Sequence, residues 1–239
     1  MQFNASQVHA PVTASEPAAA DVQEISGPVE AIDKTRPSDP IRCLAWNIES
    51  GGNDPSVIAS QLESLSGYDV VCLCEVSPRN FDTYSASKPG FSSIESEKGG
   101  ADRLQILFDD TRFKLLERKE LHDLNNGNHR SPMYVRLREQ STSTEFAVMV
   151  NHLARRDGKL RERQAAGIRD WARDQNVGVI NIGDFNLDYD FDDQKGNSGF
   201  VAIMSDGIFE WVKPTEWICL LYTSPSPRDA TLSRMPSSA

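Results

Sequence analysis

Residues 177–186 have the sequence Val-Gly-Val-Ile-Asn-Ile-Gly-Asp-Phe-Asn. The first seven form an apolar run, which favours a strand buried on both faces. Asp184 and Asn186 follow at the end of this run. An Asp at the end of a buried strand costs free energy unless it is paired or binds a metal ion. The stretch therefore predicts a buried strand that ends in a polar site.

Three other apolar strands are predicted to end in the same way. They are expected at residues 41–48, 69–76 and 146–152, and the polar residues at their ends are Asn47, Glu49, Glu75, Asn151 and His152. Carboxylate and amide oxygens are ligands for a hard cation such as Mg²⁺, and an imidazole titrates near neutral pH. If the four strand ends converge, they would supply both a metal site and a titratable group.

Helix and strand signals alternate between these clusters. Amphipathic helices are expected at 54–66, which begins with Asp-Pro, and at 160–175. Residues 91–153 carry mostly strand signals, with strands expected at 103–108, 113–121, 133–137 and 146–152 in a largely antiparallel meander. The pattern predicts an α/β fold: two packed, mixed, largely antiparallel β-sheets flanked by helices in a four-layer sandwich.

The two ends of the chain differ in composition from this domain. Residues 1–40 are rich in Ala, Pro and Ser and carry six acidic and two basic side chains, which predicts a disordered leader or linker. Residues 219–239 are rich in Ser and Pro and resemble the translation of sequencing-adapter DNA. We expect this tail to be foreign to the protein, so that the domain spans 41–218 and is incomplete at its C-terminus.

Charge and composition exclude some classes of function. A net charge of -10 argues against a protein that coats nucleic acid non-specifically, but it leaves room for a nuclease with a local basic cleft. Residues 155–163 hold five basic and two acidic side chains, and they either attract a polyanionic substrate or form a solvated helix start. No run approaches the roughly 20 apolar residues of a membrane span, so no stable membrane insertion is expected.

The four cysteines lack the spacing of a zinc site. Cys43, Cys72 and Cys74 are instead predicted to be small apolar strand residues.

The four polar clusters, in this order and at this spacing, resemble the endonuclease/exonuclease/phosphatase superfamily over about residues 41–217. Gly-Asp-Phe-Asn after an apolar strand is the strongest element, and Asn-His-Leu at 151–153 supports it. The resemblance implies a Mg²⁺- or Mn²⁺-dependent hydrolase of phosphate esters. Nucleic acid, sugar or inositol phosphates and phospholipid headgroups are all substrates on this scaffold, and the fold does not choose among them. We expect the protein to be a monomer.

The resemblance also implies which residues hold the metal ion. Glu75 corresponds to the carboxylate that binds the metal directly, and Asn47 to a second residue of the metal site. Glu49 is expected on the strand face of Asn47 by the two-residue period and could assist the metal. The alternative for Glu75 is a solvated carboxylate that ends a strand, and the alternative for Asn47 is a buried amide that satisfies backbone groups.

Further roles near the phosphate follow from the same resemblance. His152 would contact the scissile phosphate and donate a proton or a hydrogen bond to it. Asp184 would orient or deprotonate the attacking water, and Asn186 would stabilise the charged transition state. Arg130 would reach the phosphate with its planar guanidinium. Structural roles are the alternatives. His152 could be a hydrogen-bonded core residue, Asp184 and Asn186 could form only a turn, and Arg130 could be a solvated hairpin residue.

The resemblance fails at the C-terminus. Members of the superfamily end with a further strand pair and an Asp-His couple, whereas no His follows His152 here. We therefore expect this chain to be inactive as a hydrolase. The alternative function is a non-catalytic phosphate-binding module on the same scaffold. A third possibility, an unrelated α/β protein with chance clusters, predicts that Glu75, His152 and Asp184 lie far apart.

Overall fold

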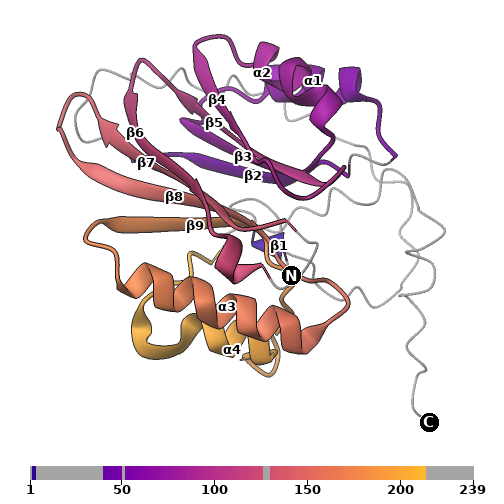
Figure 1. The fold of residues 1–239 in the computed structure, drawn as a ribbon, viewed down its shortest axis with the longest axis vertical. Helices are drawn as coiled ribbons and strands as arrows, with labels where there is room; N and C mark the ends of the chain where they lie inside the picture. Colours follow the sequence, from indigo (N-terminus) through magenta and orange to yellow (C-terminus); the bar gives the residue numbers. More distant parts are fainter. Residues whose placement is uncertain (1, 4–39, 50–51, 126–129, 214–239) are drawn as a thin grey trace.

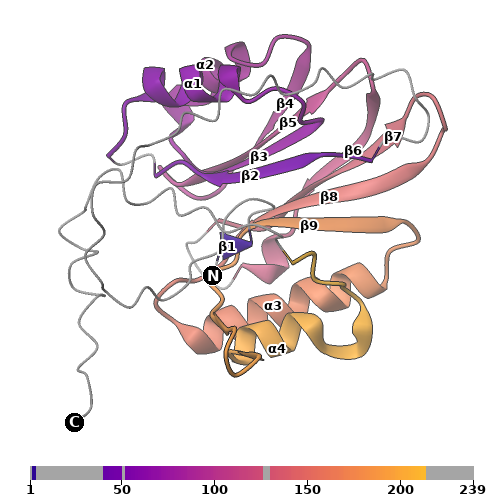
Figure 2. The same ribbon diagram turned by 180° about the vertical axis from the view of Figure 1, so that it is seen from behind.

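The computed structural model describes residues 2–3, 40–49, 52–125 and 130–213. Two β-sheets pack face to face, and helices cover the outer face of each sheet (Figures 1 and 2). One outer layer contains α1 (Pro55–Ser64) and α2 (Phe81–Ala86), and the other contains α3 (Gly158–Arg173) and α4 (Ser198–Met204). The predicted four-layer α/β sandwich is confirmed.

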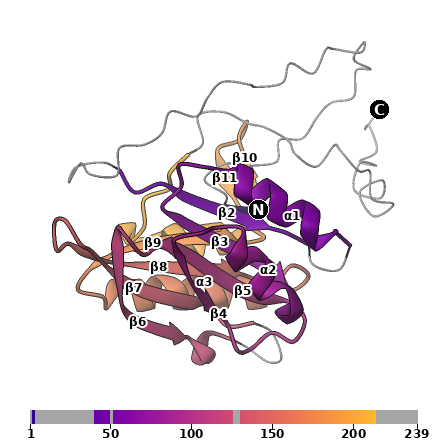
Figure 3. The ribbon, with the colours of Figure 1, turned by 90° about the horizontal axis from the view of Figure 1, so that it is seen from above.

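The first sheet has the strand order β2-β3-β5-β4. Its strands are β2 (Cys43–Asn47), β3 (Val70–Val76), β4 (Phe91–Glu95) and β5 (Arg103–Asp109). The β2/β3 pair is parallel and the other pairs are antiparallel. Helix α1 connects the parallel strands, starts at Pro55 and is capped by Asp54, whose carboxylate accepts from the Ser56 amide. Figure 3 shows α1 and α2 lying over this sheet.

The second sheet has the order β1-β9-β8-β7-β6. Its strands are β1 (Gln2–Phe3), β6 (Phe113–Glu120), β7 (Met133–Glu139), β8 (Glu145–His152) and β9 (Gly178–Asp184). Strands β6, β7 and β8 form an antiparallel meander, whereas β8 and β9 are parallel and are connected by α3. The remaining elements are short: η1 (Pro78–Asn80), η2 (His122–Leu124), η3 (Ser205–Gly207) and the hairpin β10 (Tyr189–Asp190) and β11 (Lys195–Gly196).

The chain crosses between the two sheets where a continuous meander was predicted. Strand β5 belongs to the first sheet and β6 to the second, so only three residues make the crossing. Buried Arg112 in this crossing pairs with Asp69 beside β3 at 2.9 Å and with Glu139 at the end of β7 at 2.9 Å. The guanidinium thus joins the two sheets, which is a non-local contact that strand periodicity does not reveal.

Three apolar clusters fill the spaces between the layers. Alternate residues of the strands, such as Cys72, Cys74, Leu104 and Ile106, pack between the sheets. The intervening side chains of the first sheet pack under α1 and α2, and those of the second pack under α3 and α4. Cys72 and Cys74 are buried strand residues, as predicted.

Most of the predicted leader and tail lie outside the described residues. From the leader, Gln2 and Phe3 pair as β1 with Asp184 and Gly183 of β9. The remainder of 1–39 and the tail at 219–239 lie outside, so the domain bounds 41–218 stay a prediction. Within the described ranges, every helix is too short or too polar to cross a membrane.

Candidate active site

The predicted site residues lie at the ends of four strands. Asn47 ends β2, Glu75 lies near the end of β3, His152 ends β8 and Asp184 ends β9. These strands form the two parallel pairs, one in each sheet, and β2 lies against β9 across the sandwich. Because the carboxyl ends of parallel strands meet at one edge of a sheet, both pairs deliver polar residues to the same edge of the sandwich.

Asn47 connects carboxylates from the two sheets. Its Nδ2 donates to Oε1 of Glu75 at 3.0 Å and to Oδ2 of Asp184 at 2.9 Å. A single amide nitrogen therefore lies between the two carboxylates. His152 also lies beside both of them, so the possibility of chance clusters far apart in space is excluded.

A β-bulge positions Glu75. The pairing of β3 with β5 shifts between Cys74 and Val76, and Glu75 itself has a φ of 58°, in the left-handed region. Such bulges are frequent beside active sites because they change the direction of a side chain. The Glu75 side chain is 28% exposed and accepts a hydrogen bond, so it is not a freely solvated strand end.

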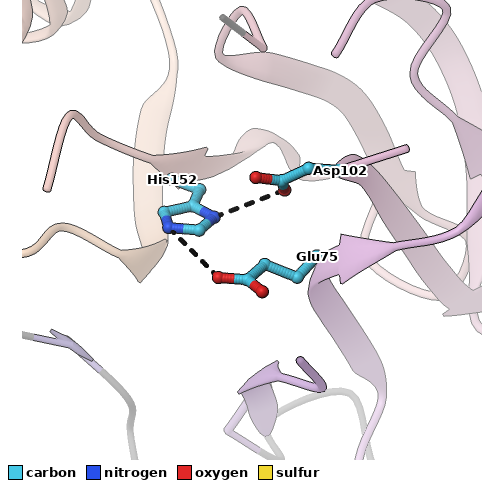
Figure 4. Close-up of side chains that lie close together, drawn as sticks. All are labelled: Glu75, Asp102 and His152. Atoms are coloured by element: carbon cyan, nitrogen blue, oxygen red, sulfur yellow. Dashed lines mark ion pairs between the residues drawn. The ribbon is translucent and has the colours of Figure 1, made fainter. Parts of the chain in front are cut away.

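His152 is almost fully buried among carboxylates. Its side chain is 4% exposed, and Nε2 lies 3.5 Å from Oδ2 of Asp184 and 3.7 Å from Oε1 of Glu75. On the other side of the ring, Nδ1 lies 3.6 Å from Oδ1 of Asp102 (Figure 4). The imidazole is thus placed between one carboxylate on its Nδ1 side and two on its Nε2 side.

Sequence reasoning missed Asp102. The search followed polar residues at strand ends, whereas Asp102 immediately precedes β5. Because β5 runs antiparallel to β3, the start of β5 lies at the same edge as the end of β3, with Arg103 opposite Val76. The signal in the sequence is Gly99-Gly100 ahead of the Asp, a tight turn: a Cβ on Gly99 would lie 2.4 Å from the carbonyl oxygen of Asp102.

Arg130 holds Asp102 and the end of β8. Its Nη1 pairs with Oδ2 of Asp102, and its Nε donates to the His152 carbonyl at 3.1 Å. The side chain is 12% exposed, so it is not a solvated hairpin residue. Its expected role at the phosphate stays a prediction.

The geometry of Gly-Asp-Phe-Asn explains each residue of that motif. Gly183 has a φ of 132°, and a Cβ there would lie 2.2 Å from the Asn151 carbonyl oxygen. Oδ1 of Asp184 accepts a hydrogen bond from the backbone N–H of Asn186 at 3.0 Å, which forms the local turn. Phe185 is buried under α3 and α4. The Asn186 side chain donates to the Leu153 carbonyl at 3.0 Å, so it links this turn to the residue that follows β8.

The prediction that Glu49 lies on the strand face of Asn47 was wrong. Strand β2 ends at Asn47, and Glu49 is exposed with a φ of 47°. The two-residue period therefore does not continue to Glu49. Its backbone N–H donates to Oδ1 of Asn47 at 3.0 Å and so orients the bridging amide.

Cys74, next to Glu75, is not suited to nucleophilic chemistry. Burial raises the pKa of its thiol, and Sγ donates to the Asn151 carbonyl at 3.2 Å. A thiol must ionise to attack, so this residue acts as a core side chain.

The balance of charge in the site favours a cation. Glu75, Asp102 and Asp184 are acidic, and the basic partners among the described residues are Arg130 and His152. A phosphate anion would be repelled by this cluster unless a cation were bound with it. The oxygen-rich donor set fits a hard divalent cation.

Comparison with solved structures identifies the fold. An endonuclease/exonuclease/phosphatase family protein from Bacteroides thetaiotaomicron is 16% identical, with a TM-score of 0.56, over 69% of this chain and 66% of that chain. The mannosyl-6-phosphatase of the same organism is 16% identical, with a TM-score of 0.57, over 70% and 71%. D. rerio TDP2 complexed with single strand DNA product is 17% identical, with a TM-score of 0.56, over 62% and 61%.

The chain thus has the fold of the endonuclease/exonuclease/phosphatase superfamily, as the sequence motifs predicted. It spans about two thirds of the length of these structures. No protein-family model matches the sequence, and no curated protein matches it.

Proposed function

We propose that the protein is a divalent-metal-dependent phosphoesterase that hydrolyses phosphodiester or phosphomonoester bonds. One observation carries the proposal: Nδ2 of Asn47 donates to Glu75 of one sheet and to Asp184 of the other, with His152 3.5 Å from Asp184. The residues that we propose for metal binding and for proton transfer therefore lie together at one point. The fold, shared with a sugar phosphatase and with a protein that holds a DNA product, supports this assignment.

Glu75 and Asn47 would hold Mg²⁺ or Mn²⁺. When bound there, the ion would neutralise charge on the phosphoryl oxygens. Asn47 would have to turn its amide to offer oxygen, since Nδ2 faces both carboxylates. Without a cation, the two carboxylates favour the orientation of the Asn47 amide in which Nδ2 donates to both of them.

Asp184 would orient or deprotonate the attacking water, and His152 would donate a proton or a hydrogen bond to the phosphate or the leaving group. Asn186 and Arg130 would stabilise charge on the transition state. Both are engaged, Asn186 with the Leu153 carbonyl and Arg130 with Asp102, so each would exchange a partner when substrate binds.

The substrate class includes nucleic acid, sugar or inositol phosphate and phospholipid headgroups. Of the structural neighbours, one has a DNA product bound and another is named as a sugar phosphatase. Arg155, Arg156 and Lys159 are exposed on the loop and helix start that follow His152, and their charge supports a polyanionic substrate. The protein would act as a monomer without stable membrane insertion.

The test is hydrolysis of bis(p-nitrophenyl) phosphate and p-nitrophenyl phosphate with Mg²⁺, with Mn²⁺ and with EDTA. In active protein, we expect metal-dependent turnover that falls by about 10² or more in Glu75→Gln. Glu63→Gln, on the exposed face of α1, is the matched control and should keep full activity. Metal-independent turnover would contradict the proposal.

The alternative, a non-catalytic phosphate-binding module, would give metal-dependent binding of the ester without turnover. The inactivity expected from the missing Asp-His couple stays a prediction, because residues 214–239 lie outside the described ranges.

A further inference from the structure

The loop 153–157 connects the active-site end of β8 to α3, and its first residue is anchored in the site. The backbone N–H of Leu153 donates to the Asp184 carbonyl at 2.9 Å, and the Leu153 carbonyl accepts from the Asn186 side chain at 3.0 Å. Arg155 follows His152 by three residues, so their Cα atoms lie within about 11 Å of each other. The loop therefore starts at the proposed site of hydrolysis and stays beside it.

Helix α3 holds the backbone of this loop. Nη1 of Arg161 donates to the carbonyls of Ala154 and Arg155, each at 2.8 Å. The buried side chain of Gln164 accepts from the Ala154 N–H at 2.9 Å. Arg161 is thus a structural residue within the basic stretch 155–163. Because the loop is already held by these contacts, a ligand that binds its side chains does not have to order its backbone.

Arg155 and Arg156 present free guanidinium groups at this position. Both residues are exposed, and neither side chain has an ion pair or a hydrogen bond within the described part of the chain. Other arginines, such as Arg130 and Arg136, pair with carboxylates. The acidic residue of the loop, Asp157, caps α3 by accepting from the Leu160 N–H. In a protein with a net charge of -10, two adjacent and unneutralised arginines therefore lie next to the site.

The site and the loop carry opposite charges. The carboxylates of Glu75, Asp102 and Asp184 would repel a phosphate unless a cation bound with it, whereas the loop attracts a phosphate directly. A guanidinium donates two parallel hydrogen bonds in a geometry that matches phosphate oxygens. A substrate with one phosphate would leave the loop unused, and a substrate with a neighbouring phosphate would engage both regions.

We propose that Arg155 and Arg156 form a second phosphate-binding site, which selects substrates with a further phosphate group beside the scissile one. The proposal rests on the proposed hydrolysis and names its substrate class. A nucleic acid strand and a small alcohol that carries several phosphates both have this chemistry. Lys159 adds an exposed cation in the first turn of α3, which favours the molecule with more phosphates, a nucleic acid strand.

The kinetic test compares two esters with the same leaving group, thymidine 5′-(p-nitrophenyl phosphate) and its 3′-phosphorylated form, in the presence of Mg²⁺. We expect the wild type to prefer the 3′-phosphorylated ester in kcat/KM by at least about tenfold. Arg155→Gln combined with Arg156→Gln should abolish this preference. The matched control is Arg42→Gln, at an exposed arginine ahead of β2 and so at the opposite end of that strand from the site; it should keep the preference. Equal preference in the wild type and the double variant would overturn the inference.

Binding is measured separately, on the full chain in EDTA so that turnover does not consume the probe. A fluorescent oligothymidylate is titrated at several salt concentrations. The double variant should bind at least about tenfold more weakly, and the slope of log Kd against log salt should fall by about 1.4, because each phosphate contact on a single strand contributes about 0.7. Arg42→Gln should change neither quantity. Equal affinity and slope in the wild type and the double variant would exclude the second site.

Competition with myo-inositol hexakisphosphate distinguishes the two sources of the second phosphate. Displacement of the oligothymidylate only by a large excess of the hexakisphosphate supports a nucleic acid strand, and displacement at equal phosphate concentration supports a small polyphosphorylated alcohol. Weaker binding by the double variant without turnover of either ester refutes only the proposed hydrolase. Turnover of both esters with an unchanged preference refutes only the second phosphate site.

Discussion

Gly183 sets how closely β8 and β9 approach each other beside the site. An added Cβ would lie 2.2 Å from the Asn151 carbonyl oxygen, and the φ of 132° is outside the range that other residues adopt without strain. We expect Gly183→Ala to lower the free energy of unfolding by about 1–3 kcal/mol. Gly178→Ala, at the start of the same strand, meets no atom within 4 Å and is the matched control. Urea unfolding of both variants measures the difference, and equal midpoints would contradict this account.

Asp184 and His152 are expected to matter for turnover more than for stability. Both are held by partners in the site, but neither fills the apolar core. Asp184→Asn and His152→Ala should each lower kcat by about 10² or more in active protein, because each removes a group that acts on the transition state. Thermal unfolding should change little. A variant with near-normal kcat would remove that residue from the proposed mechanism.

Sequence reasoning located the residues of this site whose backbone lies at the ends of buried parallel strands. Asp184 and Glu75 were found because a carboxylate after an apolar run contrasts with the run itself. Asp102 was not found, because it precedes its strand and only the antiparallel pairing of β5 brings it to the same edge. Glu49 was placed on the strand face of Asn47 because the strand was assumed to continue, but β2 ends two residues before Glu49.

The long strands and helices were predictable because periodicity and caps are local signals. Helix α3 and strands β3, β8 and β9 start and end within two residues of the predicted bounds. The seven-residue helix α4 and the six-residue α2 were missed, since two turns hold too few residues to show a helical period. The assignment of β5 and β6 to different sheets depends on Arg112, Asp69 and Glu139, which lie far apart in the sequence.

Strand β7 is joined to its neighbours through Tyr134. The ring packs against Trp171 of α3 with centroids 4.7 Å apart, and the hydroxyl donates to Glu117 of β6 at 2.8 Å. Burial, and then the hydrogen bond to Glu117 and its charge, raise the pKa of Tyr134 to about 12. The phenol of an unfolded chain has a pKa of about 10.

This shift predicts a loss of stability at alkaline pH. Between pH 10 and 12 the unfolded chain has released the Tyr134 proton while the folded chain retains it, so the free energy of unfolding falls as pH rises. Tyr134→Phe removes this titration. We expect the wild type to lose about 1 kcal/mol more than the variant between pH 9 and 11.5, measured by urea unfolding. Parallel pH dependence of the two proteins would show that the hydrogen bond is not maintained in solution.

At the scale of the whole molecule, the site lies across the junction of the two sheets. Asn47 and Glu75 belong to one sheet, and His152 and Asp184 to the other. The layer between the sheets is apolar and contains fully buried side chains such as Val148 and Leu137. Bringing the acidic groups together at the edge of this layer opposes the packing of the sheets, because their charges repel one another.

A divalent cation should therefore stabilise the fold as well as support activity. An ion that binds the folded chain alone raises the free energy of unfolding by about 2.7 kcal/mol at a hundredfold excess over its Kd. We expect Mn²⁺ to raise Tm and EDTA to reverse the rise, measured by differential scanning calorimetry. Glu75→Gln should abolish the rise, because it removes the carboxylate proposed to bind the ion directly. Val148→Ala, which leaves a cavity between the sheets, should lower Tm but keep the rise, since it removes no ligand. A Tm shift of equal size in the wild type and Glu75→Gln would place the ion elsewhere on the protein and contradict the link between this site and the packing of the two sheets.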